Sequence, residues 1–326
     1  MLQFFRSNQL FASLLLIFYG FLLHLPAWWQ SPEVMNGLDV DAGVFGKWTN
    51  EVLKGQQWLD ISAPVFLLFL TAVFANRLAF RERLSRKVTQ FPGLFIIMVG
   101  SLFPAILGVH SMQFANLFLL LAIIAAFRLY RSNDTATISF NAGFWLGIAV
   151  LFNANYAFFF FLLAAAAGSL NTLSLSLFFR LLSGVITPIF LVATYYFWNG
   201  QLDYFLDAQS LNLHLPEVVD EKLWNLGGII LISGILGFTL FKQDNNTKLL
   251  NIQGRKKINL LYVWLLFCLL ALPFFSVLDA AAIQLVVIPL GFLLSLSFSR
   301  GGASAGEAGH LFLLVVLIGL QLWPML

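Results

Sequence analysis

Residues 9–28, QLFASLLLIFYGFLLHLPAW, form an apolar run that contains no Asp, Glu, Lys or Arg. A helix needs about 20 mainly apolar residues to cross the hydrocarbon core of a bilayer, which is about 30 Å thick. Only helices and closed barrels satisfy their backbone hydrogen bonds in that core. The apolar residues here are consecutive rather than alternating, which excludes a barrel strand and predicts a membrane-spanning helix.

Similar runs recur along the whole chain of 326 residues, of which 60% are hydrophobic and 10% charged. We therefore predict an all-α integral membrane protein, a polytopic bundle of about 11 transmembrane helices without a separate soluble domain. The single cysteine, Cys268, excludes a disulfide within the chain. The predicted spans are 9–28, 58–79, 91–109, 112–129, 140–153, 156–170, 178–198, 223–241, 259–275, 279–297 and 309–325.

The basic side chains decide which way the bundle faces. If 140–153 and 156–170 fold as a hairpin, nearly all of the 18 Lys and Arg residues fall on one side, which the positive-inside rule places in the cytoplasm. If these segments form one long kinked helix instead, the cluster Lys242–Lys257 moves outside. We therefore predict the hairpin, with a cytoplasmic N-terminus and an external C-terminus in a bacterial-type inner membrane. The first run lacks a signal-peptide cleavage pattern and is expected to be retained.

Two predicted external loops are long, residues 29–57 and 199–222. Long loops on a tightly connected bundle are where function tends to reside. Most acidic residues also fall on this external side. In the first loop, apolar residues at three- and four-residue steps predict an amphipathic helix in the outer membrane interface. Those residues are Val44, Phe45, Trp48, Val52 and Leu53.

The first loop includes residues 37–64, GLDVDAGVFGKWTNEVLKGQQWLDISAP. Acidic residues follow the first span, then come the interfacial helix, a glycine and a proline that opens the second span. This order resembles the first external loop of the GT-C-type integral-membrane glycosyltransferases, such as protein O-mannosyltransferases and aminoarabinose transferases. In those enzymes a catalytic aspartate precedes the glycine by a set spacing, which counted back from Gly55 leads to Asp41. Weaker similarity in 116–153 and 185–207 extends the resemblance over residues 1–207.

The resemblance implies a GT-C-like transmembrane core over 1–207, with further transmembrane helices over 208–326. It also implies that a sugar is transferred from a polyprenyl-phosphate donor to an acceptor outside the membrane. A carboxylate would take the proton of the acceptor hydroxyl, and cations would stabilise the departing phosphate. Asp41 is the candidate base and Asp39 the next. The candidate phosphate-binding residues are His110, His214, Lys222 and Lys47.

These assignments fix the expected ligands and partners. The lipid-linked sugar is the substrate, membrane lipid surrounds the bundle, and proteins of the cell envelope are expected partners. A membrane location excludes nucleic acid as a partner, although the pI is near 9.0. No cofactor is firmly predicted. Asp39 and Asp41 could contribute two ligands to a divalent cation, but two ligands define no metal site.

Each candidate residue also has a structural interpretation. Asp39 and Asp41 can cap the interfacial helix from a solvated turn. Asp60 is expected to cap the second span rather than to react. His110 lies near the outer end of a span, where histidine often serves as an interfacial polar group. The polar residues of 153–156 are expected to satisfy a break between helices.

Two other functions remain open. A non-catalytic membrane subunit of an envelope or secretion complex is favoured by Ala42, because the family often has an acidic pair at Asp41 and the next position. The absence of an external arginine favours the same interpretation, so the chain can be a divergent or degenerate member of the family. A flippase for lipid-linked saccharides, or a transporter, predicts a hydrophilic cavity that spans both leaflets. We find no inverted repeat typical of secondary transporters.

Overall fold

The computed structural model describes the chain in segments: 2–6, 10–29, 39–53, 56–85, 89–102, 106–130, 132–170, 174–211, 217–218, 223–242, 252–275, 277–278, 280–300 and 303–323. Nearly all regular structure in them is helical. The helices and strands are α1 (Leu2–Phe5), α2 (Leu10–His24), η1 (Leu25–Trp28), α4 (Val44–Leu53), α5 (Gln57–Arg81), α6 (Phe91–Gly100), α7 (Ser111–Phe127), α8 (Thr135–Phe152), η3 (Ala154–Phe158), α9 (Phe159–Leu170), α10 (Leu175–Trp198), α11 (Leu202–Ala208), β1 (Glu217–Val218), α12 (Leu223–Phe241), α14 (Ile252–Ala271), η4 (Leu272–Phe274), β2 (Val277–Leu278), η5 (Ala280–Ile283), α15 (Gln284–Arg300) and α16 (Ala303–Leu322).

Five of the helical segments are long and apolar enough to cross a membrane: Phe11–Trp28, Gln57–Arg81, Thr135–Phe152, Leu175–Trp198 and Ile252–Phe274. Shorter apolar helices lie in the regions of the other predicted spans: Phe91–Gly100, Ser111–Phe127, Ala154–Leu170, Gly227–Phe241, Gln284–Ser299 and Gly306–Leu322. The helical class predicted from the apolar runs is therefore confirmed, and the chain is a multi-pass membrane protein by the length and composition of its helices.

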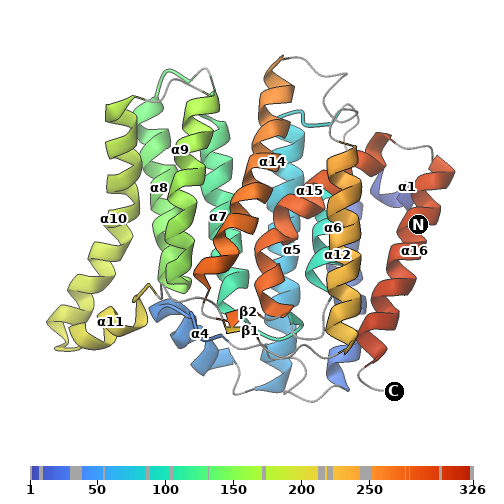
Figure 1. Ribbon diagram of the computed structural model, residues 1–326, viewed down its shortest axis with the longest axis horizontal. Helices are drawn as coiled ribbons and strands as arrows, with labels where there is room; N and C mark the ends of the chain where they lie inside the picture. The colour runs from blue at the N-terminus through green and yellow to red at the C-terminus, as the bar shows by residue number, and fades with distance from the viewer. Residues whose placement is uncertain are drawn as a thin grey trace.

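The long helices run side by side between two ends of the molecule (Figure 1). The short helices α4 and α11 lie across the lower end in this view, near the two-residue strands β1 and β2. These strands pair in parallel, with Glu217 opposite Val277. The lower end therefore gathers the residues of both long loops predicted from the sequence, as far as the structure describes them.

A break at Asn153 separates α8 from α9. Asn153 has an extended backbone (φ −150°, ψ 115°), and its side chain accepts a hydrogen bond from the backbone N–H of Asn155. The chain then turns through η3 and returns as α9 alongside α8 (Figure 1). The hairpin predicted from the distribution of basic residues is therefore present, and the single kinked helix is not.

Helix α6 is much shorter than the predicted span 91–109. It ends at Gly100, and Val109 and His110 belong to a non-helical segment that leads into α7. All ten residues of α6 are buried by neighbouring helices. Irregular backbone at membrane depth is tolerated where protein rather than lipid surrounds it. Burial of α6 therefore permits the early end that hydropathy alone does not reveal.

Two other predicted boundaries are also wrong. Helix α8 begins at Thr135 rather than at residue 140, because the side chain of Asp134 accepts a hydrogen bond from the Thr137 N–H and caps the helix. The glycine-rich stretch 299–306 predicts a flexible loop, yet α15 continues to Arg300 and α16 starts at Ala303. Glycine content lowers helix propensity but is routinely overridden by packing.

Helices α8 and α10 cross at close range through glycines. A Cβ built on Gly143 would lie 2.1 Å from the Leu181 carbonyl oxygen, and one on Gly184 would lie 2.3 Å from the Phe140 carbonyl oxygen. Gly147, one helical turn below Gly143, faces Val185 in the same way, at 2.4 Å. Small residues let helix backbones approach closely in a membrane, where lipid removes most of the hydrophobic drive for association.

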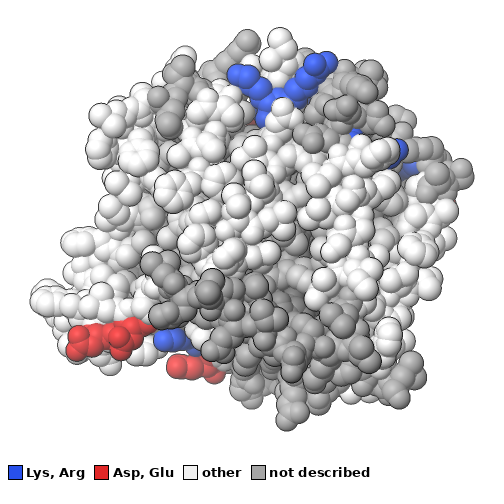
Figure 2. All heavy atoms as spheres, viewed as in Figure 1, with Lys and Arg blue, Asp and Glu red and all other residues white. Residues whose placement is uncertain are grey.

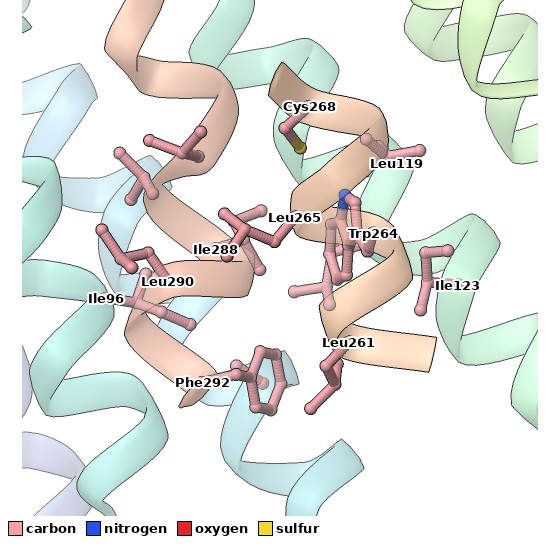
Figure 3. Close-up of a cluster of buried hydrophobic side chains, with 14 of the residues drawn as sticks. Ile96, Leu119, Ile123, Leu261, Trp264, Leu265, Cys268, Ile288, Leu290 and Phe292 are labelled. Carbon is pink, nitrogen blue, oxygen red and sulfur yellow. The ribbon is translucent and has the colours of Figure 1, made fainter. Parts of the chain in front are cut away.

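The core joins the first and last parts of the chain. Trp264 and Leu265 of α14 pack with Ile288 of α15, and Ile96 of α6 and Ile123 of α7 lie around them (Figure 3). The thiol of Cys268 donates a hydrogen bond to the Leu285 carbonyl oxygen at 3.1 Å. Helices from both predicted regions, 1–207 and 208–326, therefore share one buried cluster.

Charged side chains gather at opposite ends of the bundle. Figure 2 shows basic groups at the upper end, and acidic groups with a basic group between them at the lower left, around α4 and α11. At the upper end, Lys257 is buried and its ammonium pairs with Glu82 at the end of α5. The same ammonium lies 5.4 Å from the centre of the Tyr130 ring. Part of the basic cluster predicted as an orientation signal therefore also ties α5 to α14.

Candidate functional site

A polar cluster surrounds the segment between α6 and α7. Its centre is the carboxylate of Asp39, whose side chain is only 4% exposed. One oxygen, Oδ2, accepts hydrogen bonds from the Ser111 N–H at 2.9 Å and from the Asn50 side-chain amide at 2.7 Å. The other, Oδ1, accepts one from the Ser111 hydroxyl at 2.6 Å. Asp39 is therefore occupied as an N-terminal cap of α7, with Asn50 of α4 held to the same carboxylate.

The electrostatics of Asp39 follow from these contacts. Burial by itself would raise the pKa of the carboxyl, but His110, the Ser111 hydroxyl and N–H and the Asn50 amide together lower it below the ordinary value. Donors that point at a carboxylate favour its charged form, and the N-terminus of a helix adds a further positive potential. The ionised Asp39 is thus strongly stabilised and correspondingly weak as a base.

Asp60 supports the same segment from α5. It is 4% exposed, and its Oδ1 accepts a hydrogen bond from the Val109 N–H at 2.9 Å. Gln113 contributes a third support, because its side-chain amide donates to the carbonyl oxygens of Ile106 and Gly108 at 3.0 and 3.1 Å. Side chains thus replace the missing helical partners of 106–110. Asp60 lies in the first turn of α5, where the sequence expected a cap, and in addition it binds this distant backbone group.

His110 lies within this support rather than on an open surface. Its side chain is 2% exposed, and Nδ1 lies 3.4 Å from both Asp39 Oδ1 and the backbone nitrogen of Met112. The backbone N–H of His110 donates to the Gln113 side-chain oxygen at 3.3 Å. One tautomer of the ring donates from Nδ1 to Asp39 and the other accepts from Met112. In either state His110 helps to form the N-terminus of α7.

Asp41 differs from Asp39 in its surroundings, because it is partly exposed. Next to it, Ala42 forms an antiparallel bridge with Asn153, and the Gly43 N–H donates to the Phe152 carbonyl oxygen at 2.8 Å. A Cβ on Gly43 would lie 2.5 Å from the Leu151 carbonyl oxygen, so only glycine permits this approach. The backbone beside Asp41 is therefore fixed on the end of α8.

Helix α4 forms over the predicted residues, and its apolar side chains divide between the bundle and the exposed surface. Val44 is buried, whereas Trp48 and Val52 are 61% and 49% exposed. The buried face is instead completed by Gly46, where a Cβ would lie 2.5 Å from the Phe152 carbonyl oxygen. Trp48 and Val52 point away from the bundle, as expected for side chains that enter a membrane interface.

Lys47 of α4 is the candidate cation that the structure places at this end. Its ammonium lies 5.6 Å from the centre of the Tyr204 ring of α11, a cation–π contact. Phe205 and Ala208, also on α11, pack against Val44 beneath it. The two short helices thus form one unit, which we call the α4–α11 platform. The other candidate phosphate-binding residues, His214 and Lys222, lie outside the described residues.

Buried amides adjoin the site at the break after α8. Asn153 is 0% and Asn155 3% exposed, and neither Nδ2 has a hydrogen-bond partner within the described segments. Tyr156 follows them and donates from its hydroxyl to Asn116 Oδ1 at 2.8 Å. The polar residues predicted to satisfy the break therefore do so only in part, since two amide donors are left over.

Sequence reasoning missed the role of Ser111 and Gln113. The partner of Ser111 is 72 positions away, so no local motif links it to Asp39. A signal existed in Ser111 itself, because a small polar residue before an apolar run is typical of a helix start. Among the described residues, no group of three or more His, Cys, Asp or Glu side chains could hold a metal ion.

Comparisons of the chain with protein-family models, with curated proteins and with solved structures find no match.

Proposed function

We propose that the chain is a glycosyltransferase of the external membrane surface, which transfers a sugar from a polyprenyl-phosphate donor to an acceptor hydroxyl. One observation carries this proposal. The backbone of 41–43 is fixed on the end of α8, which leaves Asp41 partly exposed beside the α4–α11 platform, whereas Asp39 is used to cap α7. Asp41, which the spacing to Gly55 made the first candidate, and Asp39, the second, thus have different surroundings.

In the proposed reaction, the acceptor hydroxyl oxygen attacks the anomeric carbon of the donor sugar. The bond between that carbon and the phosphate oxygen breaks, and the polyprenyl phosphate leaves with the electron pair. Asp41 takes the proton of the acceptor hydroxyl. Lys47, on the same platform, stabilises the charge that develops on the phosphate. Asp39 and His110 are positioning residues, because they hold α4 and the start of α7 in place.

The proposal includes the orientation of the bundle in the membrane and the helices that cross it. The basic groups at the end opposite the platform support a cytoplasmic location for that end and an external one for Asp41 (Figure 2). With this orientation in a bacterial-type inner membrane, a lipid-linked donor reaches the platform from the outer leaflet. We propose that the shorter apolar helices cross together with the five long ones, since α6 is enclosed by its neighbours.

The test is a transfer assay with membranes, a labelled polyprenyl-phosphate sugar and the variant Asp41→Asn. Loss of a general base typically lowers the rate by about 10²–10⁴-fold, and we expect a loss of that size with unchanged expression and insertion. Asp207→Asn is the matched control, because Asp207 is an exposed carboxylate of the same platform. Transfer by Asp41→Asn at the rate of the wild type would remove Asp41 from the mechanism.

A second candidate function is a non-catalytic membrane subunit of an envelope or secretion complex. The observation that favours it is the full occupation of Asp39 by structural contacts, because a scaffold would retain such contacts without a reaction. This function predicts a stable protein partner that copurifies after mild solubilisation, together with no turnover of lipid-linked sugar. Turnover by the purified chain alone would exclude it.

A further inference from the structure

A small cavity inside the bundle has four polar side chains in a mainly apolar lining, and we call it the polar cavity; its lining residues do not come from α4 or α11. It has a volume of about 20 Å³ and is lined by residues of α5, α6, α7 and α15. Its polar lining consists of Thr71, Gln113, Asn116 and Gln284, and the rest is aliphatic. Each of these four side chains is at least nine-tenths buried.

Gln284 distinguishes this cavity from an ordinary packing defect. The side chain is 3% exposed, and both Nε2 and Oε1 are without a hydrogen-bond partner in the part of the chain that the structure describes. Its backbone carbonyl is satisfied, because the Asn116 amide donates to it at 2.7 Å. Buried polar side chains are almost always paired, so an unpartnered amide beside a polar cavity points to a ligand.

The side-chain amide of Gln284 has both a donor and an acceptor without a partner in the described segments, which favours water over an ion as the ligand. A cation would satisfy only the oxygen of Gln284, and an anion only the nitrogen. A water molecule can accept from Nε2 and donate to Oε1 at the same time, and its second hydrogen remains for another acceptor in the lining. The Thr71 hydroxyl oxygen is one such acceptor, since the hydroxyl already donates to the Leu67 carbonyl oxygen.

The volume of the polar cavity is also sufficient for one water molecule. A cavity needs about 10–15 Å³ of accessible space to hold a water molecule, and the water needs two to four polar partners. We propose that this cavity is a binding site for a single internal water molecule, which joins Gln284 of α15 to Thr71 of α5. The water extends the direct bond between Asn116 and the Gln284 backbone, and so links the N-terminal helices to the C-terminal ones within the membrane.

The same molecule contains an apolar cavity that serves for comparison. It has a volume of about 10 Å³ and lies between α6, α12, α15 and α16, and its lining is entirely apolar. Leu294 of α15 borders it and is 2% exposed, whereas Ile288 of the same helix borders the polar cavity and is 1% exposed. Because apolar cavities of this kind stay empty, Leu294 serves as the internal reference for Ile288.

Hydroxyl-radical footprinting of the full chain in nanodiscs tests the proposal. Ionising radiation splits a bound water where it lies, and the radical oxidises the side chains that touch it. We expect Ile288 to be oxidised several-fold faster than Leu294 in the wild type, and at the rate of Leu294 in the variant Gln284→Leu. Equal oxidation of the two residues in the wild type would overturn the proposal, and this comparison needs no variant to fold.

A folded Gln284→Leu variant in which Ile288 is still oxidised at the wild-type rate would also overturn it, because the radical would then come from another source. Thr71→Val provides a milder second variant, which should slow oxidation of Ile288. Its control is Thr194→Val on α10. The Thr194 hydroxyl makes the same bond within its helix, to the Phe190 carbonyl oxygen at 2.8 Å, but lies on the exposed surface. This control should leave Ile288 unchanged.

Discussion

Replacing Asp39 with alanine should destabilise the folded protein by about 3–5 kcal/mol, the usual cost of removing one partner from a buried charged network. The change leaves the Ser111 N–H and hydroxyl and the Asn50 amide without their acceptor. It also removes the cap of α7 and the bond that holds α4 to that helix. We expect a large decrease in the temperature of thermal unfolding in detergent, and loosening of the α4–α11 platform.

Two variants make this result specific to the contacts of Asp39. Asp39→Asn retains an oxygen that can accept from Ser111 and should lose less stability than the alanine variant. Asp207→Ala removes an exposed carboxylate of the same platform and should unfold at the wild-type temperature. If Asp39→Ala and Asp207→Ala unfold at the same temperature, then Asp39 does not cap α7 in the membrane.

Replacing Gly143 with alanine should be at least as damaging, because the new Cβ would lie 2.1 Å from the Leu181 carbonyl oxygen. That atom belongs to the backbone of α10 and cannot move aside as a flexible side chain would. The helices must separate, so the contacts along the whole α8–α10 crossing weaken. We expect a loss of about 3 kcal/mol or more, at the upper end of the cost of overpacking. The measurement is the yield of monodisperse protein in size-exclusion chromatography.

Gly234→Ala on α12 is the matched control. A Cβ at this helical position would have no neighbour within 4 Å, so alanine should be neutral or slightly stabilising through its higher helix propensity. A normal yield of Gly143→Ala would show that α8 and α10 do not cross at the distance described here.

Hydropathy and charge predicted the helical class and the hairpin at Asn153, because both depend on physical properties summed over many residues. The early end of α6 was missed for the opposite reason. The non-helical segment 106–110 that follows, and the first residue of α7, are held by Asp39, Asp60 and Gln113, which come from separate parts of the chain. A hydropathy pattern records the apolar character of 91–109 but not the partners that allow its backbone to leave the helix.

In the candidate site too, the sequence predicted the elements but not the contacts between them. The sequence predicted that a polar loop and an interfacial helix follow the first span, and α4 forms over Val44–Leu53. The sequence ranked Asp41 ahead of Asp39 but did not predict their different surroundings, because these come from Ser111 and Asn153, which approach from other helices. The close crossing of α8 and α10 could have been predicted from the sequence, since Gly143 and Gly147 have the spacing of small residues at close helix contacts in membranes.

The proposed glycosyl transfer depends most on the location of the α4–α11 platform outside the cytoplasm. Labelling with a membrane-impermeant maleimide tests this directly, because the only native cysteine, Cys268, is fully buried. Glu51→Cys marks the exposed face of α4, and Arg128→Cys marks the exposed end of α7 at the opposite side. We expect the maleimide to label Glu51→Cys in intact cells and Arg128→Cys only after the cells are permeabilised. The reverse pattern would contradict it, since a cytoplasmic Asp41 could not meet a donor and acceptor outside the membrane.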